Sequence, residues 1–202
     1  MRRASLLACA ALGLAACSSS APADWRFGPV IKGETYSPGM GVAPVETSSG
    51  FRFTFPTREP FEVDYVARGE LDLRRATAIR MRWRVTGGDV IPTEGEAETA
   101  TLGLVLQRRG DDWTGTGEAE FYRFYSPEAF PLIEGEFERV IPLGGTQWGS
   151  VMGRRNPAQF AETIAKLDSL GLTFGSAALR GHGARSTGAA MFELLSLEIV
   201  RD

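Results

Sequence analysis

The strongest constraint on the fold is an alternation of apolar and charged side chains near the middle of the chain. Residues 79–85 read Ile-Arg-Met-Arg-Trp-Arg-Val. Successive side chains of a β-strand point to opposite faces, so this segment has one apolar and one cationic face. The same period of two recurs at 51–55, 61–65 and 102–106. The apolar face of each such strand must be covered by a second layer.

Further strands are expected at four places, namely 119–125, 136–143, 171–175 and 190–200. Glycine-rich turns separate the strands, as at Gly87-Gly88, Gly110-Asp111 and Gly144-Gly145 and in the run 181–188. Many short antiparallel strands joined by such turns are typical of an all-β sandwich or barrel. We see no internal repeat and no domain boundary after residue 25.

One segment departs from the period of two and predicts a short α-helix over 157–168. Asn156 is a good N-cap, Pro157 suits the first helical position, and Gln159 is placed to bond back in a capping box. Gly171 is expected to end the helix. The apolar residues at helical spacing are Phe160, Ile164 and Leu167.

The N-terminus carries the features of an export signal. Arg2 and Arg3 precede an apolar stretch at 4–16 that is too short to span a bilayer, and residues 14–17 read Leu-Ala-Ala-Cys. This resembles the signals of bacterial lipoproteins, whose pattern is a leucine, two small residues and a cysteine that becomes lipidated. The alternative is a plain secretory signal in which the cysteine has no role.

The resemblance implies a division of the chain into a signal peptide (1–16), a lipidated flexible tether (17–24) and a single β-sandwich domain (25–202). Acyl chains on Cys17 would anchor the protein to a membrane of the bacterial cell envelope. Ser18 stands where an aspartate would signal retention in the inner membrane of enterobacteria, so the expected location is the outer membrane.

Charge and cysteine content narrow the partners and cofactors. The formal charge is −3, and loss of Arg2 and Arg3 with the signal brings it near −5, which argues against nucleic acid as a partner. Cys9 lies in the signal and Cys17 would carry lipid, so no thiol is left for a disulfide or a metal. With one histidine and no Asp-x-Asp-x-Asp-Gly loop, we predict neither a cofactor nor a metal site, and structural calcium is unsupported.

From about residue 70 the order of the segments is similar to that of galactose-binding-like jelly rolls, the fold of many non-catalytic carbohydrate-binding modules. The segments that carry the resemblance are Arg-Met-Arg-Trp-Arg (80–84), Leu-Gly-Leu-Val-Leu-Gln-Arg (102–108), Phe-Tyr-Arg-Phe-Tyr (121–125), Gly-Glu-Phe-Glu-Arg-Val-Ile-Pro-Leu (135–143), Trp148, Gly-Leu-Thr-Phe-Gly (171–175) and the last strand 192–200. The resemblance implies a two-sheet antiparallel jelly roll with one short packed helix. These are packing motifs, so they indicate a fold more than a ligand.

Aromatic and acidic residues provide candidates for ligand contacts. Asp111, Asp112 and Trp113 form a polar turn in which the indole ring is suited to stack on a sugar. The alternative is a tryptophan folded back over the sandwich. Tyr125 and Arg123 share one face of their predicted strand, and they would form a stacking platform with a donor unless a loop covers them.

His182 and the arginine row remain ambiguous. His182 lies between two glycines, where it would either bond a ligand or cap a turn. The row Arg80, Arg82 and Arg84 would either bind acidic glycans or lipid headgroups, or pair with carboxylates of neighbouring strands. Trp148 is expected in the core.

Catalysis has weak support, since no Gly-x-Ser-x-Gly motif is present and no catalytic residue stands out. A polysaccharide lyase would use a tyrosine, a histidine and an arginine, and these types are supplied by Tyr122 or Tyr125, His182 and Arg123. We therefore expect a non-catalytic envelope lipoprotein that binds a saccharide or another polar ligand. The alternatives are an accessory protein that docks an envelope partner, and a polysaccharide lyase or hydrolase.

Overall fold

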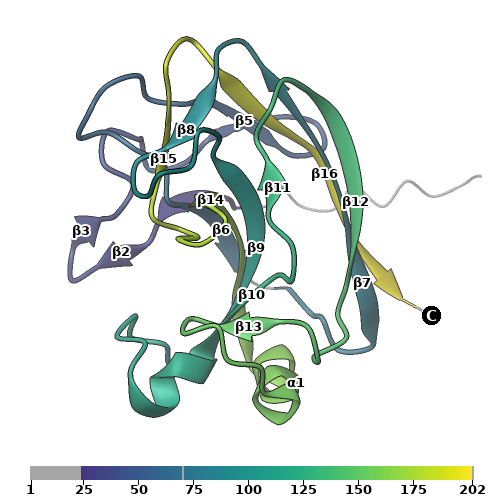
Figure 1. Cartoon of the computed structure of the whole chain (residues 1–202). Helices are drawn as coiled ribbons and strands as arrows, with labels where there is room; N and C mark the ends of the chain where they lie inside the picture. Colours follow the sequence, from purple (N-terminus) through teal and green to yellow (C-terminus); the bar gives the residue numbers. More distant parts are fainter. Residues whose placement is uncertain (1–23, 70, 202) are drawn as a thin grey trace, which may run out of the picture.

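A computed structural model describes residues 24–69 and 71–201 and shows a sandwich of two antiparallel sheets (Figure 1). One sheet has seven strands, in the order β1 (Arg26–Gly28), β6 (Tyr65–Gly69), β14 (Leu167–Gly175), β9 (Thr101–Arg108), β10 (Arg123–Tyr125) and β13 (Gly149–Ser150), with β11 (Phe130–Pro131) also paired to β9. The other has five, in the order β12 (Gly135–Pro142), β7 (Ala76–Thr86), β16 (Met191–Arg201), β5 (Phe51–Thr54) and β4 (Val45–Glu46).

Two small two-stranded sheets flank the sandwich. They pair β2 (Val30–Ile31) with β3 (Glu34–Thr35), and β8 (Val90–Pro92) with β15 (Ala184–Ser186). The chain repeatedly crosses between the two main sheets: β5, β7, β12 and β16 lie in one, and β6, β9, β10 and β14 in the other. This alternation is that of a jelly roll, so the predicted all-β sandwich is confirmed.

The core lies between the two sheets, where the strands bury their alternate residues. Ile79, Met81, Trp83 and Val85 of β7 are almost completely buried. They meet apolar side chains of the facing sheet, and rings fill much of the space between; the aromatic members of this cluster include Phe51, Phe53, Phe55, Phe124, Phe174 and Phe192. Trp148 belongs to the core as expected, and its Nε1 donates to Pro142 O at 2.8 Å.

The cationic face of β7 points to solvent and is covered by carboxylates. Arg80 lies 3.6 Å from both Glu138 and Glu198, on the strands either side, and Arg82 pairs with Glu136. Arg84 pairs with Glu136 and Glu193 in the same way. The arginine row is therefore part of an ion-pair lattice, and its charge is balanced locally.

Several element boundaries differ from those expected. The segment 61–65, expected to be a strand, is in a strand only at Tyr65, where β6 begins, with an isolated bridge at Val63. Residues 117–122 form the 3₁₀ helix η1 (Gly117–Tyr122), and only Arg123–Tyr125 of the predicted strand 119–125 extend, as β10. The helix α1 (Pro157–Ala165) begins as predicted, because Asn156 Oδ1 accepts from Gln159 N at 3.2 Å. It ends at Ala165 instead of 168, and Gly171 lies inside β14.

The ends of α1 have simple physical causes. Lys166 N still donates to Glu162 O, but Leu167 already pairs with Arg108 of β9, so the sheet takes over where the helix stops. The Gln159 side chain accepts from Arg108 Nη1 at 3.2 Å rather than forming the expected capping box. Within the described ranges, no helix is long and apolar enough to cross a bilayer.

Candidate functional site

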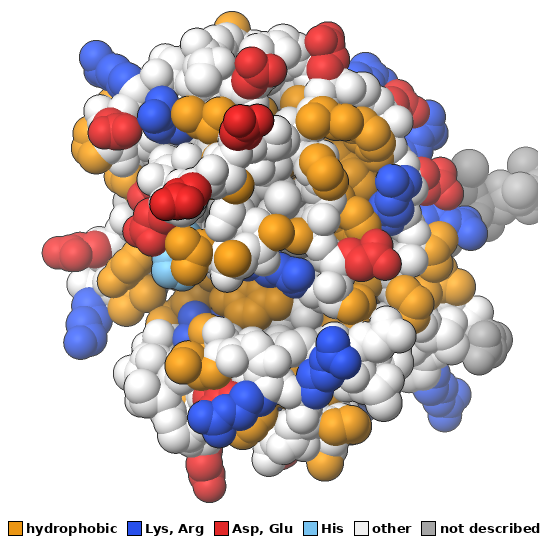
Figure 2. Space-filling view, in the orientation of Figure 1, with side chains coloured by type: hydrophobic (Ala, Val, Ile, Leu, Met, Phe, Trp, Pro, Cys, Tyr) orange, Lys and Arg blue, Asp and Glu red, His pale blue; other side chains and the backbone are white. Residues whose placement is uncertain are grey.

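A cleft of about 370 Å³ opens against the outer face of the seven-stranded sheet. It lies between the end of β10 and two loops, residues 147–155 around β13 and residues 177–182 after β14. Figure 2 shows the surface hollowed at this place, with the chain's single histidine at the rim. The volume is within the range of small-molecule sites.

The floor of the cleft contains Tyr125, the last residue of β10. Its neighbour Phe124 faces the core, so Tyr125 points to the outer face, where its ring is 8% exposed. The Tyr125 and Tyr65 hydroxyls are 2.9 Å apart and hydrogen-bonded to each other. Burial raises the pKa of both phenols above the ordinary value, so both remain protonated and able to donate at neutral pH.

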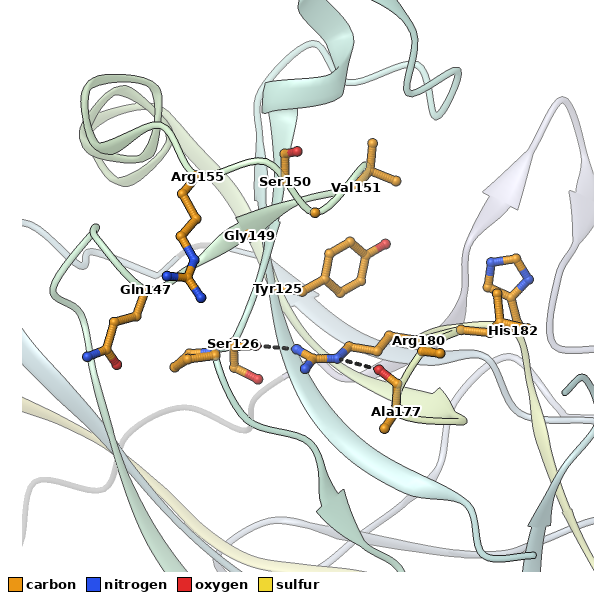
Figure 3. A pocket seen from close by; sticks show the side chains of 14 residues that line it. Tyr125, Ser126, Gln147, Gly149, Ser150, Val151, Arg155, Ala177, Arg180 and His182 are labelled. Carbon is orange, nitrogen blue, oxygen red and sulfur yellow. Dashed lines mark hydrogen bonds between the residues drawn. The ribbon is translucent and has the colours of Figure 1, made fainter. Parts of the chain in front are cut away.

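Arg180 lies beside Tyr125, with its guanidinium held by the backbone (Figure 3). Its Nη1 donates to Ser126 O and its Nε donates to Ala177 O at 3.4 Å. Burial lowers the pKa of this group, against the opposing effect of Tyr125. The next residue, Gly181, has φ +72°, and a Cβ there would collide with the Tyr65 ring, so the loop needs glycine to lie this close.

The opposite wall comes from the segment around Trp148, residues 147–155. Gln147 and Arg155 are exposed and line the cleft. In Figure 3 the guanidinium of Arg155 points toward Ser126. Ser150 Oγ donates to Glu120 Oε1 at 2.9 Å, which fixes the wall to η1. The wall is thus a turn that is hydrogen-bonded to η1 and carries exposed polar side chains.

Arg123 and Asp111 form a buried ion pair next to the cleft. Arg123 Nε is 2.9 Å from Asp111 Oδ2, and the two side chains are 6% and 0% exposed. Burial raises the pKa of Asp111, and the charge of Arg123 opposes this rise. Gln107 Nε2 also donates to Asp111 Oδ2, at 3.1 Å. The pair fastens the 111–115 loop to the sheet.

Trp113 is folded back over the outer face of the sheet. Its ring lies 4.5 Å from the Arg123 guanidinium and meets Tyr65 edge-on, with ring centroids 5.3 Å apart. Its backbone has φ +67° and its N–H donates to Asp111 Oδ1 at 2.9 Å. Trp113 is half-buried in this packing and is not part of the cleft lining. Its contact with a ligand stays a prediction.

The structure thus brings together only some of the predicted site residues. Tyr125 and His182 line the cleft, whereas Arg123, Asp111 and Trp113 pack beside it. Asp112 is exposed and its carboxylate accepts from Thr114 N and Oγ1, which stabilises the turn. Cys17 lies outside the described residues.

His182 is at the rim, and its Nδ1 is 3.1 Å from Glu94 Oε2. The Tyr125 hydroxyl is hydrogen-bonded to the Tyr65 hydroxyl, and Arg123 forms an ion pair with Asp111. Each of the three residue types that a lyase would use therefore already has a partner within the protein. Across residues 24–69 and 71–201, no three His, Cys, Asp or Glu side chains are grouped so as to hold a metal ion.

Sequence reasoning missed Arg180, Arg155 and Gln147. Arg180 adjoins the glycine-flanked His182, so the signal that drew attention to that loop also marked the arginine. Arg155 follows Gly153 and Arg154 in a short basic turn, which gives no indication of its neighbours in space. Only the fold shows that these two loops meet.

Comparison of the sequence with protein-family profiles and with curated proteins found no match. Among solved structures, the chain is similar to that of a candidate glycoside hydrolase from Bacteroides thetaiotaomicron. The identity is 11% and the TM-score 0.38, over 92% of this chain and 72% of the other. A likeness at this level supports no conclusion about function.

Proposed function

We propose that this protein is a lipid-anchored envelope protein whose β-sandwich binds a saccharide or a similar polar ligand in the cleft without transforming it. The observation that carries the proposal is the cleft itself, which joins a tyrosine floor to a wall of hydrogen-bond donors. Saccharides offer hydroxyls to such donors and apolar C–H faces to a ring. The lipidation of Cys17 and the outer-membrane location belong to the proposal through the sequence motif alone.

The test is binding of the full-length chain, purified in detergent, to a panel of neutral and acidic oligosaccharides and peptidoglycan fragments. Ala178→Trp places a large ring in the cleft from an exposed position and should weaken binding at least about tenfold. Ala189→Trp is the matched control, because Ala189 is exposed and is not part of the cleft lining. It should bind as the parent does.

Three results would contradict the proposal. Equal binding by Ala178→Trp and the parent would place the ligand elsewhere, and silence across the panel would favour the accessory role. Shortened or unsaturated products after incubation would replace non-catalytic binding with the lyase or hydrolase alternative.

A further inference from the structure

The charges around the cleft are unlike those of the rest of the surface. Among the described residues that line it are Arg155, Arg180 and His182, and none is an aspartate or glutamate. The chain as a whole has 25 acidic residues against 22 lysines and arginines. Arg155 and Arg180 give the cleft positive charge in an acidic protein, while at the rim Glu94 Oε2 lies 3.1 Å from His182 Nδ1.

The two cleft arginines differ in their partners from the arginines that form ion pairs, although Arg52, Arg68 and Arg109 also lack a carboxylate partner within the described residues. Arg82 and Arg84 are paired on the five-stranded sheet, and Arg108 and Arg123 are paired with Glu162 and Asp111. Neither Arg155 nor Arg180 forms an ion pair with a carboxylate of the described chain. Arg180 is half-buried, so its charge is partly desolvated without a counter-charge.

The geometry of Arg180 favours an anion over a neutral hydroxyl. Its Nη1 and Nε are committed to the carbonyls of Ser126 and Ala177, which holds the guanidinium plane in one orientation. Its Nη2 makes no hydrogen bond to another described residue, and Arg180 lines the cleft. A fixed guanidinium is well suited to an oxyanion, and Arg155 supplies a second, exposed donor from the opposite wall (Figure 3).

We propose that the ligand of the cleft is an anionic saccharide, whose carboxylate or sulfate group is bound between Arg180 and Arg155. This inference rests on the proposed function, because it names the class of saccharide that the same cleft takes. The sugar ring lies toward Tyr125 and Gln147, and the anionic group supplies the counter-charge that the protein does not provide.

Calorimetric titration of the full-length chain with three probes tests this. The probes are an oligogalacturonate, its methyl ester and a sulfated oligosaccharide. The ester keeps the sugar backbone but replaces each carboxylate with a neutral methyl ester, and the third probe separates sulfate from carboxylate recognition. We expect at least one anionic probe to bind about tenfold or more tightly than the ester, with an affinity that falls as salt rises.

Two variants locate the effect. Arg155→Ala should lower the affinity for the anionic probe about tenfold and should leave the fold intact, because the side chain is exposed. Arg180→Lys keeps the charge but loses the planar fork, and should also weaken binding. The control is Arg52→Ala, an exposed arginine on the outer face of the opposite sheet, which makes the same change in net charge and should bind as the parent does.

The results separate the two proposals. If neutral and anionic probes bind equally and Arg155→Ala has no effect, the inference is overturned while saccharide binding stands. If no saccharide of any kind binds, both fail. Loss of anion binding in Arg155→Ala but not in Arg52→Ala supports the inference.

Discussion

At the scale of single residues, the most unusual group is Asp64, a buried carboxyl just before β6. Its Oδ1 has no hydrogen-bond partner among the described residues. Burial, together with the nearby carboxylates of Glu62 and Glu94, raises its pKa from 3.8 to about 8. The folded protein therefore holds a proton at Asp64 at neutral pH that the unfolded chain does not.

This predicts a pH dependence of stability with a definite sign. Between about pH 4 and pH 8 the folded state binds one more proton than the unfolded state. The free energy of unfolding should therefore fall by roughly 1.4 kcal/mol for each unit by which the pH rises. Asp64→Asn mimics the protonated form and should flatten this slope and raise stability at pH 8. Urea unfolding from pH 5 to pH 8 measures it.

The control for Asp64 is Asp72→Asn, because the pKa of Asp72 is lowered to about 2 by its hydrogen bonds to Arg74. Asp72 is ionised throughout this range, so its replacement should leave the slope between pH 5 and pH 8 as it is. A slope that is the same in the parent and in Asp64→Asn would show that Asp64 is already ionised in the folded protein.

The Arg123–Asp111 pair makes a second residue-scale prediction. Asp111→Ala leaves a buried guanidinium without its counter-charge and should cost about 3–5 kcal/mol of unfolding free energy. The double variant Asp111→Ala/Arg123→Met removes both charges and should recover part of that loss. Glu136→Gln, which cuts an exposed pair, should cost far less. Chemical denaturation measures all three, and similar costs for Asp111→Ala and Glu136→Gln would contradict the account.

At the scale of elements, the local pattern predicted long strands well and short irregular ones poorly. Residues 79–85 lie in β7, which buries one face, and residues 102–106 lie in β9, which is buried on both faces. Residues 119–122 have the residue types of a strand, yet they form η1 because Glu120 turns inward to accept from Ser150 and pair with Arg154. Those partners are about 30 residues away, beyond any local pattern.

The cap of α1 is an element whose strength can be measured. Asn156→Ala removes the acceptor for Gln159 N and should cost about 1 kcal/mol, which lowers the melting temperature by roughly 2–4 °C in a chain of this size. Asn156→Ser retains an acceptor oxygen and should lose much less. Thermal unfolding followed by circular dichroism compares them, and equal losses would mean that the cap contributes nothing.

At the scale of the whole molecule, the site is made where distant loops meet. The loops 147–155 and 177–182 leave different elements of the chain and converge over Tyr125. The sequence indicated the fold, Tyr125 and His182, but the cleft arginines became visible only with both loops in place. Trp113 stood out as a candidate because it is large and follows Asp111 and Asp112. In the structure, Asp111 accepts from the backbone N–H of Trp113, and the Trp113 ring lies over Arg123.

Hydrogen–deuterium exchange of the full-length chain, with and without an oligogalacturonate, tests the central claim most directly. The account predicts slower exchange on binding in the backbone of the two cleft loops, 147–155 and 177–182, and little change elsewhere. Protection confined to residues 111–115 around Trp113, or to the five-stranded sheet, would contradict it and place the ligand outside the cleft.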